Sequence, residues 1–236
     1  MAITNPPPNC IERIHECGYE SCVFISWPHM IRKSARALVE DLARDLEDRF
    51  RDYGGAKVFL DRMRLQQGYE WEPVLRQNLC RSAITIVLLV NSYFKSEYCC
   101  TEWAITEGLQ DGRLPRDEKA ATCFLPFVLQ KNMTLPDEVR RIQHEDSEFF
   151  APLLVYSRRP SEHDSWGQIV EKIHDRIVAV LEMLSRVQRP SEDWEGDERF
   201  AQAAGPKQFT WPKMPEPTPA RPRRSLPPMM PDGSKA

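Results

Sequence analysis

The chain has 236 residues, 41% of them hydrophobic and 28% charged, with a formal net charge of −3, so it can build one substantial domain but carries no basic field typical of a dedicated nucleic-acid binder. It contains no apolar run of about 18 residues that could span a membrane, and its start, MAITNPPPNC, lacks the charged and apolar regions of a signal peptide. We therefore expect a cytoplasmic protein that binds neither a membrane nor nucleic acid.

The N-terminal quarter predicts a strand, a helix and a second strand. Residues 1–18 are proline-rich and then polar, which is typical of a leader or a short helix. Residues 22–26 (CVFIS) are a short apolar run that predicts a buried strand. Residues 29–53 carry apolar side chains at helical spacing opposite a charged face, which indicates a surface helix on a sheet. Residues 57–61 then predict the second strand.

The middle of the chain continues the alternation. It predicts a short helix over residues 70–80, a strand over 83–90, a helix over 96–110 and, after a charged loop, a strand over 121–129. The run AITIVLLV at 83–90 is apolar on both faces, as expected of a central parallel strand that helices cover on both sides.

The last part of the chain adds three elements and a tail. A short helix is expected over residues 135–144, a fifth strand over 151–157 and a strongly amphipathic helix over 164–187. The chain then becomes rich in proline, which predicts a disordered or extended tail. The predicted organisation is a leader at 1–18, one domain at 19–188 and a tail at 189–236.

Five strands that alternate with helices predict an α/β fold, a flavodoxin-like doubly wound sheet of five parallel strands in the order 2-1-3-4-5. In this order a ligand crevice opens between the carboxyl ends of the first and third strands. This topology gathers five side chains in one region: Ser26, Trp27, Asp61, Trp71 and Glu102.

Several familiar sites are absent from the sequence. It contains neither G-x-G-x-x-G nor G-x-x-x-x-G-K, which excludes the usual dinucleotide and P-loop phosphate sites, and no G-x-S-x-G nucleophile elbow. His29 starts a helix and is interpreted as a helix-entry residue rather than a catalytic base. The seven cysteines, an odd number, favour reduced thiols, and the spacing of Cys10, Cys17 and Cys22 does not favour zinc.

Three motifs occur in order: FIS at residues 24–26, FLD followed by a loop with G-x-x-W ending at Trp71, and NSYFKSEYCCTEW at residues 91–103. Together they resemble the Toll/interleukin-1 receptor (TIR) domain over residues 22–186. S-E-Y-C-C-T-E is similar to the family block S-x-W-C-x-x-E, whose glutamate is catalytic in NAD-cleaving members and maps onto Glu102. Residues 62–71 resemble the BB loop, which gates the site and mediates assembly.

The resemblance implies cleavage of the nicotinamide–ribose bond of NAD⁺, as substrate and without a cofactor, to ADP-ribose or a cyclic isomer in immune or defence signalling. Because the transition state resembles an oxocarbenium ion, the Glu102 carboxylate is expected to stabilise it and hold the ribose hydroxyls. The expected partners are other copies of the domain, through TIR–TIR contacts, and an activating or downstream protein.

The resemblance also implies substrate-binding roles around Glu102. Trp27 and Trp71 are expected to stack on the nicotinamide or adenine rings, and Arg62 or Arg64 to meet the diphosphate. The full set of expected substrate-binding residues is Phe24, Ser26, Trp27, Asp61, Arg62, Arg64, Trp71, Ser92 and Tyr98.

The chain departs from the family pattern at two places, and other interpretations stay open. Trp27-Pro28 follows F-I-S where a tyrosine is common, and Tyr98 replaces the tryptophan before the cysteine; neither change removes the carboxylate. Glu102 could simply favour the helix dipole, and Trp71 could anchor its helix in the core. The alternative function is a non-enzymatic adaptor that assembles through its BB loop, with the tail as a tether. A nucleoside deoxyribosyltransferase-like enzyme is disfavoured by the BB-like loop.

Overall fold

The centre of the structure, a computed structural model, is a sheet of four parallel strands in the order β2-β1-β3-β4. The described residues are 10–28, 33–51, 57–60, 71–114, 122–130, 132–142, 159–187 and 191–212. The strands are β1 Ser21–Ser26, β2 Val58–Leu60, β3 Ser82–Leu89 and β4 Phe124–Val128. The α/β class and the predicted order of the first four strands are confirmed. The fifth strand, predicted at residues 151–157, lies outside the described residues.

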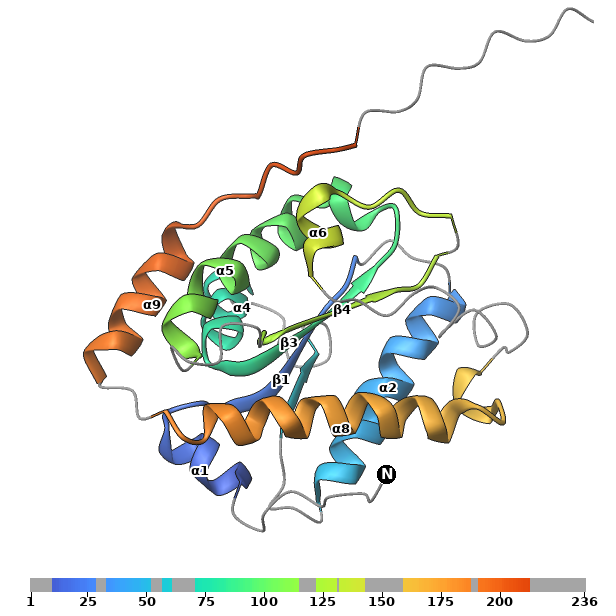
Figure 1. Ribbon diagram of the computed structural model, residues 1–236, viewed down its shortest axis with the longest axis horizontal. Helices are drawn as coiled ribbons and strands as arrows, with labels where there is room; N and C mark the ends of the chain where they lie inside the picture. Colours follow the sequence, from blue (N-terminus) through green and yellow to red (C-terminus); the bar gives the residue numbers. More distant parts are fainter. Residues whose placement is uncertain are drawn as a thin grey trace, which may run out of the picture.

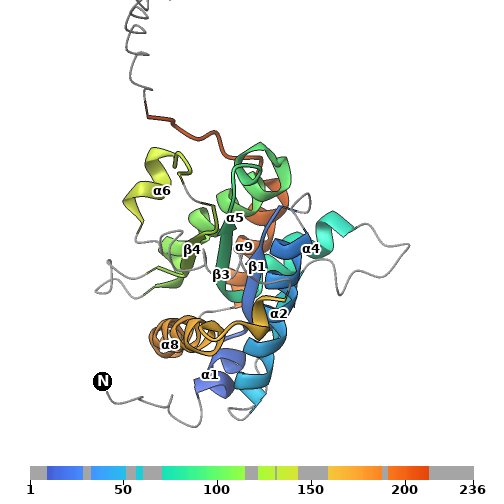
Figure 2. The same ribbon diagram turned by 90° about the vertical axis from the view of Figure 1, so that its right-hand side faces the viewer.

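Helices cover both faces of the sheet (Figures 1 and 2). They are α1 Cys10–Glu16, α2 Lys33–Arg51, α4 Trp71–Cys80, α5 Glu97–Arg113, α6 Asp137–Arg141, α8 Trp166–Leu184 and α9 Ser191–Ala203, with 3-10 turns η1 Tyr93–Lys95 and η2 Pro160–Glu162. Helices α1, α2 and α8 lie on one side of the sheet, whereas α4, α5 and α9 lie on the other (Figure 1). The sheet is therefore a buried middle layer between two helical layers.

The alternation of side chains along β1 explains how the core divides. Val23 and Ile25 join the larger hydrophobic cluster with α1, α2 and α8, whereas Phe24 joins a second cluster with α4 and α5. Because successive side chains of a strand point to opposite faces, Ser26 shares the α4–α5 face with Phe24. The strand therefore ends with a polar side chain that faces the helical layer containing α5.

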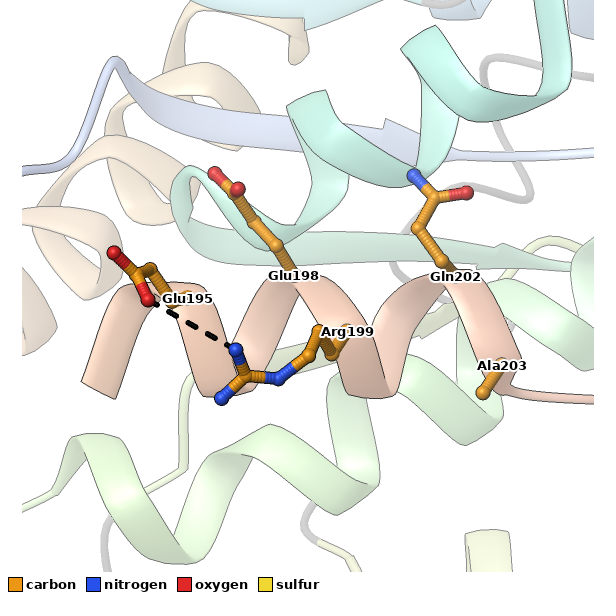
Figure 3. Close-up of a pocket in the computed structure, with 5 residues that line it drawn as sticks. All are labelled: Glu195, Glu198, Arg199, Gln202 and Ala203. Atoms are coloured by element: carbon orange, nitrogen blue, oxygen red, sulfur yellow. Dashed lines mark ion pairs between the residues drawn. The ribbon is translucent and has the colours of Figure 1, made fainter. Parts of the chain in front are cut away.

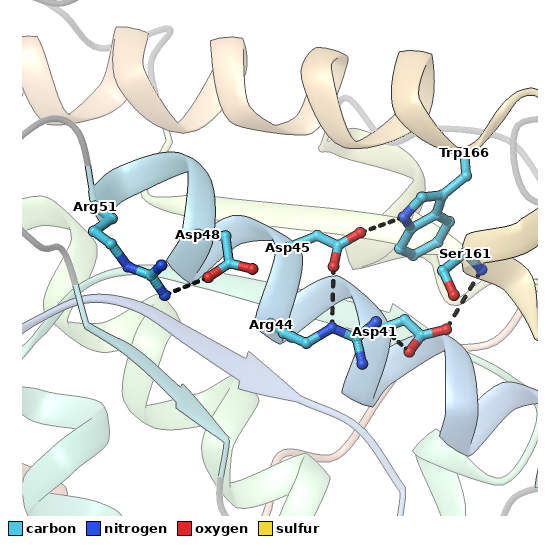
Figure 4. Close-up of polar contacts among 7 residues, drawn as sticks. All are labelled: Asp41, Arg44, Asp45, Asp48, Arg51, Ser161 and Trp166. Carbon is cyan, nitrogen blue, oxygen red and sulfur yellow. Dashed lines mark hydrogen bonds and ion pairs between the residues drawn. The ribbon is translucent and has the colours of Figure 1, made fainter.

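Polar contacts hold the turn before α8 against α2 (Figure 4). The indole Nε1 of Trp166 donates to a carboxylate oxygen of Asp45 at 2.6 Å, and the backbone N–H of Ser161 donates to Asp41 at 3.4 Å. Arg44 pairs with Asp41 at 2.6 Å on the surface of α2. This hydrogen bond holds the first residue of α8 against α2, and α8 begins two residues after its predicted start.

The first part of the predicted tail is folded, which corrects the expectation of disordered or extended chain from residue 189. Residues 191–203 form α9, which packs on α4. The side chain of Trp194 is buried, and its Nε1 donates to the Cys17 carbonyl at 3.2 Å. The Arg76 side chain of α4 donates to the carbonyls of Ala201 and Ala204 at 2.8 and 2.7 Å, which caps the C-terminal end of α9.

Residues 204–212, called here the C-terminal strap, run from α9 toward α6 (Figure 1). Phe209 packs edge-on against Phe94 and Trp103, with ring centroids 4.9 and 5.3 Å apart. The backbone N–H of Lys207 donates to the Cys100 carbonyl at 3.2 Å. The strap therefore adds apolar and hydrogen-bonded contacts to the helix that carries Glu102.

Candidate active site

The site begins where β1 ends beside the second turn of α5. Ser96 precedes α5 and accepts a hydrogen bond from the Cys99 backbone N–H at 3.4 Å, a weak N-cap. Glu102 lies one and a half turns into the helix, and its side chain meets the end of β1. The hydroxyl of Ser26 donates to Glu102 Oε2 at 2.5 Å. Ser26 and Glu102, predicted to share a region from topology alone, are in direct contact.

Tyr93 extends this contact into the protein interior. It lies in η1, directly after β3, and is fully buried. Its hydroxyl oxygen lies 2.8 Å from Ser26 Oγ and 3.2 Å from the Cys99 carbonyl oxygen. Burial raises the pKa of the Tyr93 phenol well above its usual value, so the phenol stays protonated. A buried phenol, a hydroxyl and a carboxylate thus form one hydrogen-bonded chain.

Glu102 also lines a groove between α4 and α5. The lining side chains are Glu72, Leu75, Arg76, Leu79, Tyr98, Thr101, Glu102 and Ile105. Glu102 is 6% exposed, whereas Tyr98 at the groove edge is 50% exposed. The groove between the described side chains is shallow, with a volume of about 10 Å³, so the buried carboxylate borders a small groove beside an accessible aromatic ring.

The charges of α4 beside this groove are already paired. The Arg76 guanidinium contacts the Glu72 carboxylate at 2.7 Å and also holds the end of α9. The guanidinium therefore serves the structure, and a diphosphate at this groove would need another cation. The residues predicted for that role, Arg62 and Arg64, lie outside the described residues.

The other predicted site residues are distributed differently. Phe24 is fully buried and stacks on Phe59 with ring centroids 5.4 Å apart, so it supports the core rather than a pocket surface. Trp27 is buried in the cluster with α2 and α8, on the other face from Ser26. This corrects the expectation that its ring stacks on substrate. Ser92 is half-buried ahead of η1.

Two further predicted residues receive no side-chain description. Trp71 begins α4, which agrees with its predicted place at the end of the loop, but its side chain is not among those described. Asp61 lies outside the described residues. Their roles toward a substrate stay predictions.

Tyr93 is the residue of the site that the sequence did not single out. It lies 67 positions from Ser26, so their contact depends on β1 and β3 being neighbours. The signal was nonetheless present, because Tyr93 follows the third strand at the same edge of the sheet where Ser26 ends the first.

Other chemistries find less support in the described residues. The described residues hold no cluster of histidine, cysteine and carboxylate side chains fit for a metal ion, and none of their helices is long and apolar enough to cross a membrane. The seven cysteines are all buried and unbridged, and burial raises the pKa of the Cys22 thiol to about 12. A thiol with such a pKa is a poor nucleophile.

A second depression lies on α9, far from the strand ends. It is lined by Glu195, Glu198, Arg199, Gln202 and Ala203 (Figure 3). Glu195 and Arg199 form an exposed ion pair at 3.8 Å across one helical turn. Glu198 there pairs with Arg81 at 2.6 Å and Gln202 donates to the Pro73 carbonyl at 3.3 Å, so these side chains hold α9 in place, and the groove at Glu102 remains the better candidate for chemistry.

Comparison with known proteins agrees with the motifs. No curated protein matched the chain. Among protein families, residues 23–153 match the family described as the TIR domain, which covers more than half of the chain. The matched range runs from β1 through β4 and α6 and includes Ser26, Tyr93 and Glu102. The chain therefore belongs to the TIR domain family.

Proposed function

We propose that this protein cleaves the bond between nicotinamide and ribose in NAD⁺, with Glu102 as the catalytic carboxylate. The observation that carries the proposal is the placement of the Glu102 side chain, which borders the α4–α5 groove while a buried hydroxyl holds it. A structural glutamate in the same helix, such as the exposed Glu97, has no comparable setting.

The reaction asks little of the protein beyond charge stabilisation. When the bond between the ribose C1′ and the nicotinamide nitrogen breaks, both bonding electrons go to the nitrogen, and neutral nicotinamide leaves. The sugar then carries positive charge like that of an oxocarbenium ion, and a nearby carboxylate stabilises it. Water that attacks C1′ and loses a proton gives ADP-ribose, whereas attack by a group of the same nucleotide gives a cyclic isomer.

The surroundings of Glu102 fit the remaining needs of such a ligand. The ring of Tyr98 at the groove edge offers a stacking surface for nicotinamide or adenine. Membership of the TIR family favours a role in immune or defence signalling, and seven buried, unbridged cysteines agree with a reducing compartment such as the cytoplasm.

The first prediction is that Glu102→Gln abolishes NAD⁺ cleavage. Glutamine keeps the shape but cannot stabilise a cation, so nicotinamide release should fall by about 10²-fold or more. The measurement is chromatographic separation of nicotinamide, ADP-ribose and cyclic products after incubating NAD⁺ with concentrated purified protein.

Glu97→Gln is the matched control, because Glu97 is an exposed carboxylate five residues earlier on the same helix; it should keep wild-type activity. Equal activity in wild type and Glu102→Gln would refute the assignment of Glu102. If neither protein releases nicotinamide under any condition, the result would favour the alternative function, a non-enzymatic adaptor.

A further inference from the structure

The hydrogen-bonded chain at Glu102 has a defined direction. The hydroxyl of Ser26 has one proton, which it donates to Glu102 Oε2, so toward Tyr93 it can only accept. Tyr93 also has one proton, and its two acceptors lie at 2.8 Å (Ser26 Oγ) and 3.2 Å (Cys99 carbonyl). The contact with the Cys99 carbonyl has the phenol as donor, and since Ser26 gives its own proton to Glu102, the contact with Ser26 also needs the phenol proton, which the two acceptors share. The order of donation is therefore Tyr93 to Ser26 to Glu102.

The Tyr93 end of this hydrogen-bonded chain is rigid. Tyr93 has no exposed surface, and its ring packs edge-on against Phe94 and Trp103, with centroids 5.5 and 6.4 Å away. Since η1 follows β3 directly, the phenol is fixed relative to the sheet rather than to a loop. Tyr93 does not line the groove between α4 and α5, so it acts on a ligand only through Ser26 and Glu102.

We propose that Tyr93 is a positioning residue, which through Ser26 orients the Glu102 carboxylate and favours its ionised form. A hydroxyl that donates to a carboxylate stabilises the charged form, and a second donor behind it strengthens that hydrogen bond. The phenol, whose pKa burial keeps high, remains a donor throughout the neutral range. The effect on catalysis rests on the function proposed above. The hydrogen-bonded chain from Tyr93 through Ser26 to Glu102, called here the relay, does not depend on that function.

Other charged or titratable groups border the relay and must be held constant in any test. Among the described residues they are Glu72 and Arg76 of α4 and Tyr98, Cys99 and Cys100 of α5. None of them is changed in the variants chosen below, so a shift in the titration of Glu102 reports on the relay.

The test uses four proteins with their glutamate side-chain carboxyl carbons labelled with ¹³C: the wild type, Ser26→Ala, Tyr93→Phe and the double variant. The carboxyl resonance that Glu102→Gln removes is followed by NMR against pH. Ser26→Ala should move the titration midpoint of Glu102 upward, since it removes the direct donor. Tyr93→Phe should move it upward by less. The double variant should equal Ser26→Ala, because Tyr93 acts only through Ser26.

Tyr19→Phe is the control for loss of a buried phenol, because Tyr19 is also buried but lies beside Trp194, away from Glu102. It should leave the Glu102 titration unchanged. The relay is overturned if neither single variant moves that midpoint, or if the shift from Tyr93→Phe is the same with and without Ser26.

Activity measured on the same proteins separates the relay from the proposed function. The acidic limb of the pH profile of kcat/KM should move upward in the order found by NMR. Tyr93→Phe should lower kcat by up to about tenfold with little change in KM, the effect expected for the loss of one hydrogen bond between neutral groups. A shifted Glu102 titration without nicotinamide release would uphold the relay and reject NAD⁺ cleavage. Nicotinamide release with an unshifted Glu102 titration would uphold NAD⁺ cleavage and reject the relay.

Discussion

At the scale of single residues, the left-handed conformation of Gly18 lets the end of α1 pack closely against Trp194 of α9. Its φ is +94°, and its N–H donates to the His15 carbonyl at 2.9 Å while the N–H of Tyr19 donates to Ile14 at 3.2 Å. This is the Schellman arrangement that ends α1 with a left-handed residue. An added Cβ would lie 2.5 Å from Trp194 Nε1 of α9.

Gly18→Ala is therefore expected to lower the free energy of unfolding by about 2 kcal/mol, from the left-handed backbone and the contact with Trp194 together. Urea denaturation measures the change. Gly167→Ala in α8 is the control, since its added Cβ meets nothing within 4 Å. That control should be neutral or slightly stabilising. Equal stability of the two variants would contradict the role given to Gly18.

Residue patterns predicted part of the site correctly and misplaced Trp27, whereas the predicted roles of residues outside the described ranges stay predictions. Ser26 and Glu102 were predicted correctly as neighbours because the predicted strand order and the family block point to the same edge of the sheet. Trp27 was misplaced because it was judged by its aromatic type, although side-chain alternation puts it on the opposite face from Ser26. The contact of Tyr93 with Ser26 depends on the packed sheet, which a linear pattern does not specify.

At the scale of elements, α9 is the part of the fold that the sequence concealed. The proline content of the tail suggested disorder, and the run SEDWEGDERFAQA has a weak apolar face. Its helical signals are local, with Ser191 ahead of two acidic residues that favour a helix start. Tertiary contacts hold α9 in place. Arg81 pairs with Glu198 at 2.6 Å, and Phe200 lies over Gly108 of α5.

The contact between Gly108 and Phe200 gives the prediction at this scale. A Cβ at Gly108 would lie 2.4 Å from Phe200 Cζ, so Gly108→Ala must displace the half-exposed ring and should lower the free energy of unfolding by about 1 kcal/mol. Gly196→Ala in α9 meets nothing within 4 Å and should raise it by up to about 1 kcal/mol through helix propensity. Thermal or denaturant unfolding compares both variants with wild type. If Gly108→Ala stabilises as much as Gly196→Ala, then α9 does not pack closely on α5.

At the scale of the whole molecule, the described helices leave only the Tyr98 edge of the site exposed. Helix α9 packs on α4 and α5, and the strap continues over α5 toward α6 (Figure 2). The groove edge at Tyr98 stays half exposed beside the buried Glu102. The order of the first four strands was predictable from the alternation of strands and helices and from connection rules. How far the site is closed stays a prediction, because the resemblance assigns closure to the BB-like loop, of which residues 62–70 lie outside the described residues.

TIR domains generally self-associate through TIR–TIR contacts, and we expect a second copy that packs beside Tyr98 to form a further wall of the groove. We therefore expect the rate of nicotinamide release per protomer to rise with protein concentration, because only the associated fraction has a complete site. Initial rates measured over a wide range of concentration, beside light scattering to follow association, check this. Glu102→Gln, mixed in excess with wild type, should raise the rate per wild-type protomer, since it can provide the wall without providing the carboxylate. A total rate strictly proportional to wild-type concentration, with no response to added Glu102→Gln, would mean that one chain closes its own site.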